Sequence, residues 1–373
     1  MTPRKMIMVL TVVSSLGHAQ TFEWDGGGTD DNFGTGANWN PDGSPSVGSG
    51  VVLRFTGSTR TTPNNNYTSG DDFGEWHLYA GAGADFTIGG NSFDLFSKIE
   101  VDSGVGRNLT LNTGAINAGA NIEINPVGGN ITLGSGTAVE LHNNRTLNVY
   151  DGNFGRTLTI NGTLSNGNGT GGNGALILNE TSTVVLTGIS NDYGNTTINN
   201  NTTLRVGAGG TSGTLGQGTV TNNGSLFFNR SDDLTASNNI SGSGSLTKQG
   251  AGVLTLSGTN TYTGKTAVNG GTLSINDDAR LGNAPGSAVA DQLSLSAGTL
   301  RITAGTTIAT NRGITLSGGS TFNSSSIGTS ANFNVNSIIA GSGGLTLAAN
   351  GDTSTTGGGV GGNLHLNNTS NSF

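Results

Sequence analysis

The sequence predicts an all-β protein, a right-handed parallel β-helix (β-solenoid) that opens with an aromatic-rich β cap. Three observations support this prediction. Gly, Thr, Asn and Ser make up more than half of the 373 residues, and only 10% of the residues are charged, a composition poor in helix formers. Short segments alternate between apolar and polar residues along most of the chain, and the three Trp residues lie near its beginning.

Residues 1–19 have the pattern of a secretory signal peptide. Arg4 and Lys5 precede a short apolar run, and small residues lead to Ala19, so we expect cleavage between Ala19 and Gln20. No later stretch approaches the ~20 apolar residues of a membrane-spanning helix. We therefore expect an exported protein, secreted or at the outer cell surface, without a transmembrane segment in this chain.

Residues 20–107 are predicted to form an N-terminal β-rich cap region. They contain Trp24, Trp39 and Trp76 and most of the large aromatic residues. A solenoid needs such a cover, because its end coil otherwise exposes an apolar face and an open strand edge. If the three Trp rings are exposed, they are candidates for stacking on sugars, which makes a carbohydrate-binding module in the cap one alternative function.

Residues 108–373 are predicted to form the solenoid itself. Leu109-Thr110-Leu111 and Ile131-Thr132-Leu133 are typical of its strands. Apolar residues two apart lie on one face of a strand, with the polar residue between them on the other. Gly and Asn between the strands supply tight turns. Each coil then needs only a few inward apolar side chains, whereas a sandwich usually has longer strands and a richer core.

Residues 240–283 contain the most specific motif in the chain. Its fixed positions are Gly250, Gly252, Leu254, Leu256, Gly258, Asn260, Tyr262, Gly264, Val268, Gly271 and Leu273. The segment resembles the autotransporter-associated β-strand repeat of bacterial secreted and surface proteins. A degenerate copy is predicted at about 174–220, and a truncated one at 338–373. The resemblance implies a passenger-type β-solenoid that is exported and serves a structural or adhesive role.

The chain stops at Phe373, in the middle of the third copy. We therefore expect a fragment of a longer protein. A coil that ends there presents an open strand edge, so edge-to-edge self-association at this end is expected.

Several other functions are disfavoured by the composition. The pI is about 4.8 and the 15 basic residues are scattered, which argues against nucleic acid as a partner. The chain has no Cys, and therefore neither disulfides nor a cysteine metal site. Gly264-Lys265-Thr266 lacks the spacing and the helix of a phosphate-binding loop. Neither a metal site nor a cofactor is predicted, and the acidic pairs, such as Asp30-Asp31, are read as solvated turn residues.

Histidine gives little sign of a site. His77, His142 and His365 have no His or acidic residue two to four positions after them, so they are predicted to be isolated surface or turn residues rather than metal ligands.

We therefore predict no catalytic residues and a structural or adhesive protein, with surface glycans or other cell-surface components as its partners. The second alternative function is a polysaccharide-acting β-helix of lyase or glycosidase type. Successive coils could bring its carboxylates together. The candidates for that chemistry are Glu100, Asp102, Glu123, Glu140 and His142.

Overall fold

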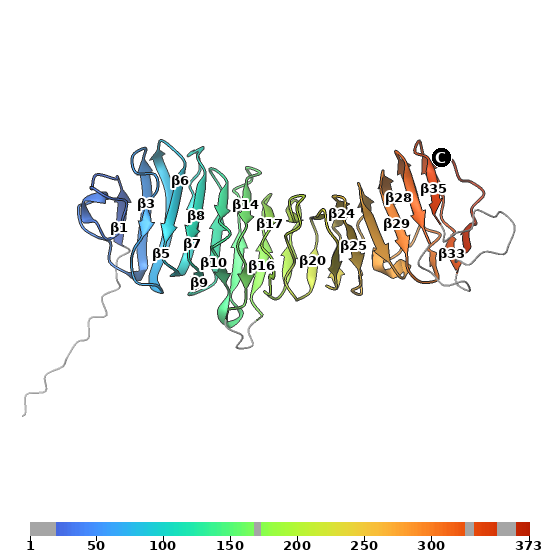
Figure 1. Cartoon of the computed structure of the whole chain (residues 1–373), viewed down its shortest axis with the longest axis horizontal. Coiled ribbons are helices and arrows are strands. Elements are labelled where there is room, and N and C mark those ends of the chain that lie inside the picture. The colour runs from blue at the N-terminus through green and yellow to red at the C-terminus, as the bar shows by residue number, and fades with distance from the viewer. Residues whose placement is uncertain (1–19, 168–172, 325–331, 349–362) are drawn as a thin grey trace, which may run out of the picture.

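In the computed structural model the chain forms one elongated rod of stacked β coils (Figure 1). The structure describes residues 20–167, 173–324, 332–348 and 363–373. Strand pairing in these residues is parallel except between β1 and β2. Their helical segments are three short 3₁₀ turns: η1 (Gly36–Asn38), η2 (His142–Asn144) and η3 (Asp278–Leu281). The predicted all-β parallel solenoid is confirmed. The predicted signal peptide lies outside the described residues.

The largest sheet has 14 strands and runs from the N-terminal end to the middle of the rod. Its main path is β2 (Trp39–Asn40), β1 (Gln20–Trp24), β3 (Gly48–Gly57), β5 (Asp71–Ala82), β7 (Phe93–Val101), β10 (Ile122–Asn125), β13 (Thr146–Val149), β16 (Ala175–Leu178), β18 (Thr196–Ile198), β20 (Val220–Asn222) and β23 (Ile240–Ser241). Beside this path lie β9 (Ile116–Ala118), β12 (Val139–Glu140) and β15 (Leu164–Ser165).

A second sheet of 13 strands extends along almost the whole rod. In spatial order its strands are β4 (Asn64–Asn65), β6 (Phe86–Gly90), β8 (Leu109–Thr113), β11 (Ile131–Leu133), β14 (Thr157–Ile160), β17 (Thr183–Leu186), β19 (Thr203–Val206), β21 (Ser225–Asn229), β24 (Ser245–Gln249), β26 (Thr266–Val268), β28 (Val289–Ser296), β31 (Arg312–Ser317) and β34 (Ile339–Gly341). The segment 20–107 therefore pairs in parallel with the coils that follow it, through β6–β8 and β7–β10.

Two smaller sheets lie in the C-terminal half. The six-stranded sheet contains β22 (Leu234–Ala236), β25 (Val253–Leu256), β27 (Thr272–Ile275), β29 (Thr299–Ile302), β32 (Ser320–Asn323) and β35 (Leu345–Ala348). The three-stranded sheet contains β30 (Thr306–Ile308), β33 (Asn332–Val335) and β36 (Asn363–Leu366).

One column of inward side chains runs through the second sheet and shows how the coils stack. Each member is the register partner of the next, and each is buried. The column consists of Phe86, Leu109, Ile131, Leu158, Val184, Leu204, Leu226, Leu246, Thr266, Leu293, Ile314 and Ile339. A strand needs only one or two such residues, because the same position of the coils above and below completes the packing.

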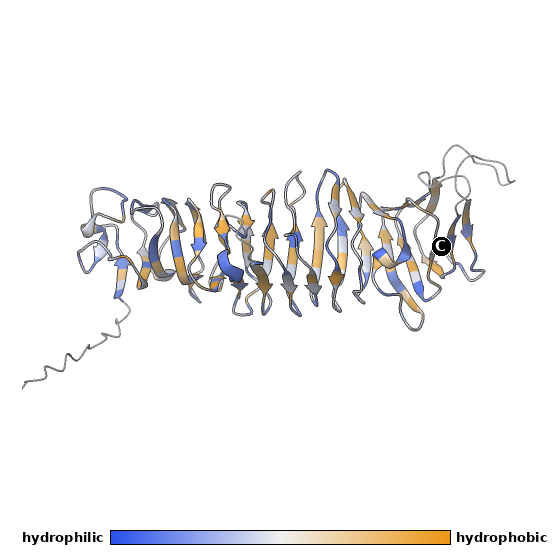
Figure 2. Ribbon diagram, turned by 90° about the horizontal axis from the view of Figure 1, so that it is seen from below, coloured by the Kyte–Doolittle hydropathy of each residue, from blue (hydrophilic) through white to orange (hydrophobic). Residues whose placement is uncertain are grey.

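The residues between these apolar positions face outward. Thr110, Thr132 and Thr159 form an outward row of register partners on β8, β11 and β14. Figure 2 shows the corresponding alternation of hydrophobic and hydrophilic residues along the strands. A polar face and an apolar face follow from the two-residue period of a strand. The thin core accounts for the low hydrophobic content of the sequence.

Glycine allows the coils to approach closely at the corners. A Cβ atom on Gly264 would lie 2.0 Å from the carbonyl oxygen of Gly244 in the preceding coil. At Gly250 the backbone is left-handed, with φ of 74°, a conformation that glycine adopts without a steric cost. The abundant glycine of the sequence is thus a consequence of coil-to-coil contact as well as of turn formation.

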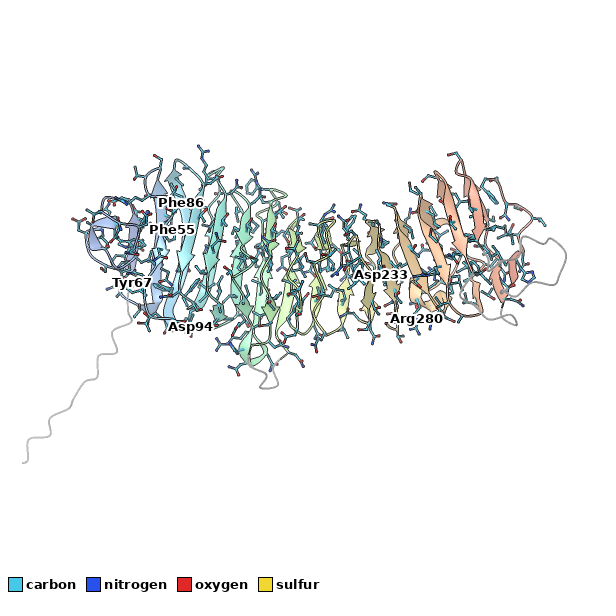
Figure 3. All side chains as sticks on the ribbon, viewed as in Figure 1. Phe55, Tyr67, Phe86, Asp94, Asp233 and Arg280 are labelled. Atoms are coloured by element: carbon cyan, nitrogen blue, oxygen red, sulfur yellow. The ribbon has the colours of Figure 1, made fainter. Side chains whose placement is uncertain are left out.

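Aromatic side chains fill the interior of the N-terminal coils. Phe33, Trp39, Phe55 and Trp76 are buried and contact one another with ring centroids 5.4–6.1 Å apart. Figure 3 shows Phe55 and Phe86 within this end of the rod. The tilted and edge-to-face arrangements are those that the quadrupoles of the rings favour.

The inward column predicts a difference between neighbouring residues of β14. Leu158→Ala removes buried side-chain volume and should lower the free energy of unfolding by about 2–5 kcal/mol. Thr159→Ala, on the outward face of the same strand, should change it by less than about 1 kcal/mol. Urea denaturation followed by circular dichroism measures both. Equal effects would contradict the assignment of faces.

Candidate functional surface

A charged ladder lies on the outward face of the first coils. Its residues project from β1, β3, β5, β7 and β10 or directly follow them, and most are register partners across neighbouring strands. The ladder consists of Glu23, Arg54, Glu75, His77, Lys98, Glu100, Asp102, Glu123 and Asn125. Buried residues such as Trp76 and Ile99 alternate with them, so strand periodicity places the charges outside.

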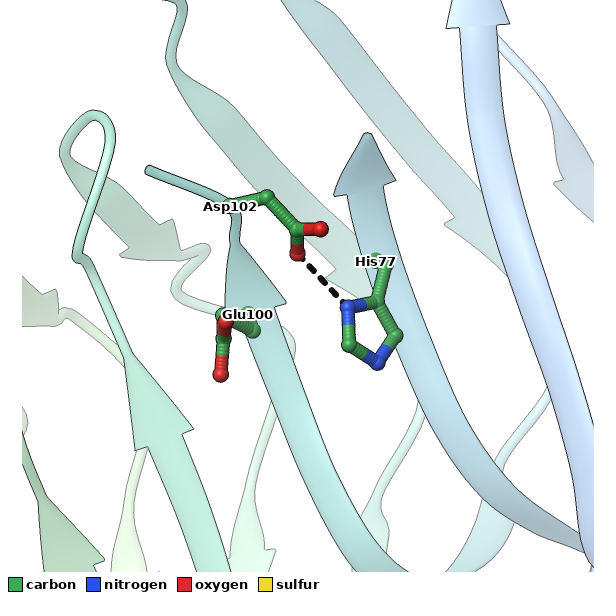
Figure 4. A group of neighbouring side chains, drawn as sticks. All are labelled: His77, Glu100 and Asp102. Atoms are coloured by element: carbon green, nitrogen blue, oxygen red, sulfur yellow. Dashed lines mark hydrogen bonds and ion pairs between the residues drawn. The ribbon is translucent and has the colours of Figure 1, made fainter. Parts of the chain in front are cut away.

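His77 lies at the centre of this ladder. Its register partner on the next strand is Glu100. The His77 Nδ1 atom is 2.6 Å from Asp102 Oδ1, and its Nε2 atom is 2.9 Å from Glu75 Oε2. Figure 4 shows His77 between the two strands, with Asp102 beside it. Both ring nitrogens face a carboxylate, and the contact with Asp102 links β5 to the end of β7.

A second part of the ladder surrounds Glu100. Lys98 Nζ donates to Glu100 Oε2 at 2.8 Å. The Asn125 Nδ2 atom donates to Glu100 at 3.4 Å and to Glu123 at 2.9 Å. One amide therefore bridges two carboxylates, and the ladder continues from β7 to β10.

These contacts change the acidity of two groups. Burial raises the pKa of Glu75, but hydrogen bonds from His77 and Ser97 and the positive charges of His77 and Lys98 outweigh burial and lower it below 4.5. Burial lowers the pKa of Lys98, but the hydrogen bond and charge of Glu100 outweigh burial and raise it above 10.5. Both groups are therefore charged at neutral pH.

The ladder also contains one possible metal-ligating group. Donor atoms of His77, Glu100 and Asp102 all lie within 4.8 Å of one another. Imidazole with two carboxylates is a donor set that suits Zn²⁺. However, His77 and Asp102 already bind each other, and Lys98 already neutralises Glu100. The residues fit an ion by type, but their present contacts form an ion-pair network that joins the coils.

The prediction that His77 and His142 are isolated is wrong. Each has a carboxylate two positions before it: Glu75 for His77, and Glu140, whose Oε2 is 3.0 Å from His142 Nε2. Residues two apart on a strand face the same side. The two pairs are therefore visible in the sequence when the residues before each histidine are considered as well as those after it. The contact from His77 to Asp102 spans 25 residues and depends on coil register, which local spacing does not give.

The residues considered for polysaccharide chemistry fall into two groups. Glu100, Asp102 and Glu123 belong to the charged ladder. Glu140 and His142 pair with each other at another position on the coil, where Glu140 is the register partner of Asn117.

The three Trp residues are in the core. Trp24, Trp39 and Trp76 have no exposed surface, and Trp76 stacks on Phe93 with ring centroids 4.1 Å apart. The indole nitrogens of Trp24 and Trp39 donate to backbone carbonyls. Sugar stacking needs an exposed ring face, so the proposed glycan-stacking role of these residues is corrected by the structure. The aromatic residues of the N-terminal coils instead pack on one another in the interior.

The motif residues of 240–283 have clear structural roles. Leu254 and Leu256 on β25, Val268 on β26 and Leu273 on β27 are inward and buried. A Cβ atom on Gly252 would lie 1.9 Å from the carbonyl oxygen of Asp232, which excludes a side chain there.

Asn260 links three successive coils. Its Oδ1 atom accepts from the backbone N–H of Ile240 at 3.0 Å, and its Nδ2 atom donates to the carbonyl oxygen of Arg280 at 2.8 Å. Each partner is 20 residues away, and Asn260 is almost fully buried. Asn260 thus satisfies the buried Ile240 N–H and the partly buried Arg280 carbonyl.

Tyr262 fills the interior next to this asparagine. Its hydroxyl is 2.7 Å from Thr266 Oγ1, and both residues are buried. Burial raises the pKa of Tyr262 to about 12, so the hydroxyl stays neutral. Thr266 occupies a position that is apolar in the neighbouring coils, and the tyrosine accounts for this exception.

The same segment matches a known family. The family model of the passenger-associated transport repeat matches residues 246–275. The chain therefore contains a passenger-associated transport repeat. An 82-residue stretch is also 44% identical to the adhesin BmaC autotransporter of Brucella suis biovar 1 (strain 1330). That stretch is 22% of this chain and 2% of the relative. No solved structure matches the chain.

Similar side-chain contacts occur in the two segments where further copies are predicted. Asn191 accepts from the backbone N–H of Leu164 and donates to the carbonyl oxygen of Thr214, as Asn260 does in its coil. The Tyr193 hydroxyl is 3.1 Å from Thr196 Oγ1. In the third copy, Asn371 accepts from the backbone N–H of Ile339 at 2.9 Å.

Lys248 fixes one corner of the passenger repeat. Its Nζ atom donates to the carbonyl oxygens of Gln249 at 2.7 Å and Gly250 at 2.8 Å, and the residue is 2% exposed. Burial lowers the pKa of Lys248 to about 8.

Within the described residues, none of the helices has the length and apolar character to cross a membrane.

The asparagine of the passenger repeat predicts a large stability effect. Asn260→Ala leaves the buried Ile240 N–H and the partly buried Arg280 carbonyl without their partner, and should cost about 1–3 kcal/mol of unfolding free energy. Asn269→Ala, at an exposed corner of the same repeat, should be nearly neutral. Urea unfolding of the two variants makes the comparison. Similar midpoints for both would show that Asn260 does not join the coils.

The ladder predicts a specific pH dependence. The pKa of Glu75 is lowered by folding, so its carboxylate stabilises the folded chain above pH 4.5, and this contribution is lost as pH falls through the folded value. Glu75→Gln should reduce stability at pH 7 by about 1 kcal/mol. The difference from the unmodified chain should shrink at acid pH.

Thermal unfolding between pH 7 and pH 3 measures this dependence, with Asp42→Asn, a change in an exposed loop, as the control. A difference between Glu75→Gln and the unmodified chain that stays constant with pH would contradict the assignment.

Proposed function

We propose that this chain is an extended adhesive segment of an exported surface protein and has no catalytic activity of its own. The observation that carries the proposal is the passenger repeat, which continues a single β-solenoid rather than forming a separate domain. The relative with the matching stretch is an autotransporter adhesin. The chain spans 2% of that relative's length, so its role in the whole protein is part of the proposal.

The architecture supports contact through the outer faces of the rod. Inward positions are occupied mainly by apolar side chains, which leaves the outward rows to meet other molecules. A long rod carries those rows away from its point of attachment and repeats them at the spacing of the strands, ~4.8 Å. Surface glycans and other cell-surface components are the proposed partners.

Adhesion is tested with fluorescent beads that carry the full chain. We expect these beads to be retained on epithelial monolayers or on plates coated with cell-surface polysaccharide, and beads that carry albumin to be washed off. Chain denatured in urea and then immobilised is the matched control for folding. Retention no greater than that of albumin on every surface would refute an adhesive role.

A polysaccharide-acting enzyme is the second candidate, and one observation favours it. Asn125 holds Glu100 and Glu123 on one outward face, and glycoside hydrolysis uses two nearby carboxyls. We expect no turnover, because Lys98 neutralises Glu100 and because the Tyr79 ring beside the ladder is covered by the Arg54 guanidinium. Release of reducing or unsaturated sugar from polysaccharides, lost in Glu100→Gln and Glu123→Gln, would establish the enzyme instead.

A further inference from the structure

A shallow hollow lies on the outward side of the coils around β7, β9 and η2. Its volume is about 330 Å³. The lining residues are Asp94, Phe96, Asn117, Ala118, Gly119, His142, Asn143 and Arg145. Figure 3 shows Asp94 at the outer edge of the rod. The hollow is separate from the ladder. Its residues on β7 lie near the start of that strand, whereas the ladder residues Lys98 and Glu100 lie near its end.

A glycine shapes the floor of this hollow. The backbone N–H of Gly119 binds the carbonyl oxygen of Leu95 at 2.7 Å, which places Gly119 one coil above Phe96. A Cβ atom on Gly119 would lie 2.6 Å from the Phe96 ring. The ring therefore lies against bare backbone and is only partly buried. Any larger residue at 119 would displace it.

Hydrogen-bond donors and acceptors surround the Phe96 ring. Asn117 Nδ2 donates to Asp94 Oδ1 at 2.8 Å, which orients the carboxylate and leaves its second oxygen as an acceptor. Arg145 donates through Nη1 to the carbonyl oxygen of Ala118, and a guanidinium has four further N–H donors. His142 is held by Glu140 at 3.0 Å. These groups come from three successive coils and are fixed by contacts with them.

We propose that this hollow binds one pyranose ring of a neutral glycan. A pyranose has an apolar C–H face that packs on an aromatic ring and hydroxyls at its edge that both donate and accept hydrogen bonds. Phe96 supplies the platform, Asp94 and Asn117 the acceptors, and Arg145 the donors. The carboxylate in the lining and the net charge of −8 disfavour an acidic sugar.

Two other hollows lack this combination. One, of about 570 Å³, is lined by small and acidic residues around Asp277 and Asp278 and has no aromatic ring. The other, of about 410 Å³, includes Phe228, but that ring is 2% exposed and belongs to the core. Of these hollows, the one around Phe96 alone offers a partly exposed ring with both a carboxylate and a guanidinium.

The inference rests on the proposed adhesive function and names its ligand class. Saturation-transfer NMR with the full chain and methyl β-D-galactopyranoside or methyl α-D-glucopyranoside tests it directly. We expect saturation transfer to at least one glycoside, and an affinity roughly tenfold weaker in Phe96→Ala, since about 1.4 kcal/mol corresponds to that factor. Asp94→Asn should weaken binding through loss of the charged acceptor.

Phe154→Ala is the matched control, because Phe154 is a 58% exposed aromatic residue outside the hollow. It should bind like the unmodified chain. Circular dichroism verifies that each variant is folded. Absence of saturation transfer from both glycosides, or unchanged binding by Phe96→Ala and Asp94→Asn, would overturn the proposal.

Bead adhesion separates this inference from the proposed function. Retention that Phe96→Ala abolishes and the bound glycoside inhibits supports both. Retention of unmodified and Phe96→Ala beads alike, without inhibition by either glycoside, leaves adhesion intact and refutes the hollow as the adhesive site.

Discussion

The stacking of each coil on the next, in register, is the constraint on which the rest of the structure depends. Parallel backbone hydrogen bonds join equivalent positions of successive coils, and the inward side chains form columns at the same spacing. A shift by one residue would exchange the inward and outward faces. The apolar columns therefore fix the register, and the register in turn decides which outward side chains meet. The charged ladder and the hollow around Phe96 both follow from it.

Much of the fold could be predicted from the sequence, because a strand's two-residue period is local. Leu109-Thr110-Leu111 already shows which residues face inward, and the segment 240–283 shows its coil corners. The role of the asparagines was also accessible through the motif, since Asn191 and Asn371 accept a backbone N–H from the preceding coil as Asn260 does. Such features repeat from coil to coil and can be recognised in the amino-acid sequence alone.

The sites were less predictable because they depend on the length of each coil. His77 meets Asp102 across 25 residues, and Asn117 meets Asp94 across 23. These numbers vary as corners lengthen or shorten, so sequence spacing does not reveal the contact. The assignment of the Trp residues to sugar stacking was wrong for a different reason. Their concentration near one end fits either an exposed binding face or a packed cap, and only the burial of the rings distinguishes the two. The strand period does place Phe96 on the outward face with Asp94, out of phase with the buried Phe93 and Leu95. It does not show which residues of the following coils surround the ring.

The charged ladder gives the rod two unlike ends. Its carboxylates and cations are concentrated in the coils before residue 126, whereas from residue 234 onward the sequence contains only four acidic residues. Salt that screens exposed charges therefore acts mainly on the outward ion pairs of the first coils, whereas the Arg312–Asp278 pair of the other half is shielded by the burial of Arg312. A molecule built this way does not loosen uniformly when its surroundings change. Its outward charges respond to ionic strength mainly in the first coils, while the whole rod shares a single stack of strands.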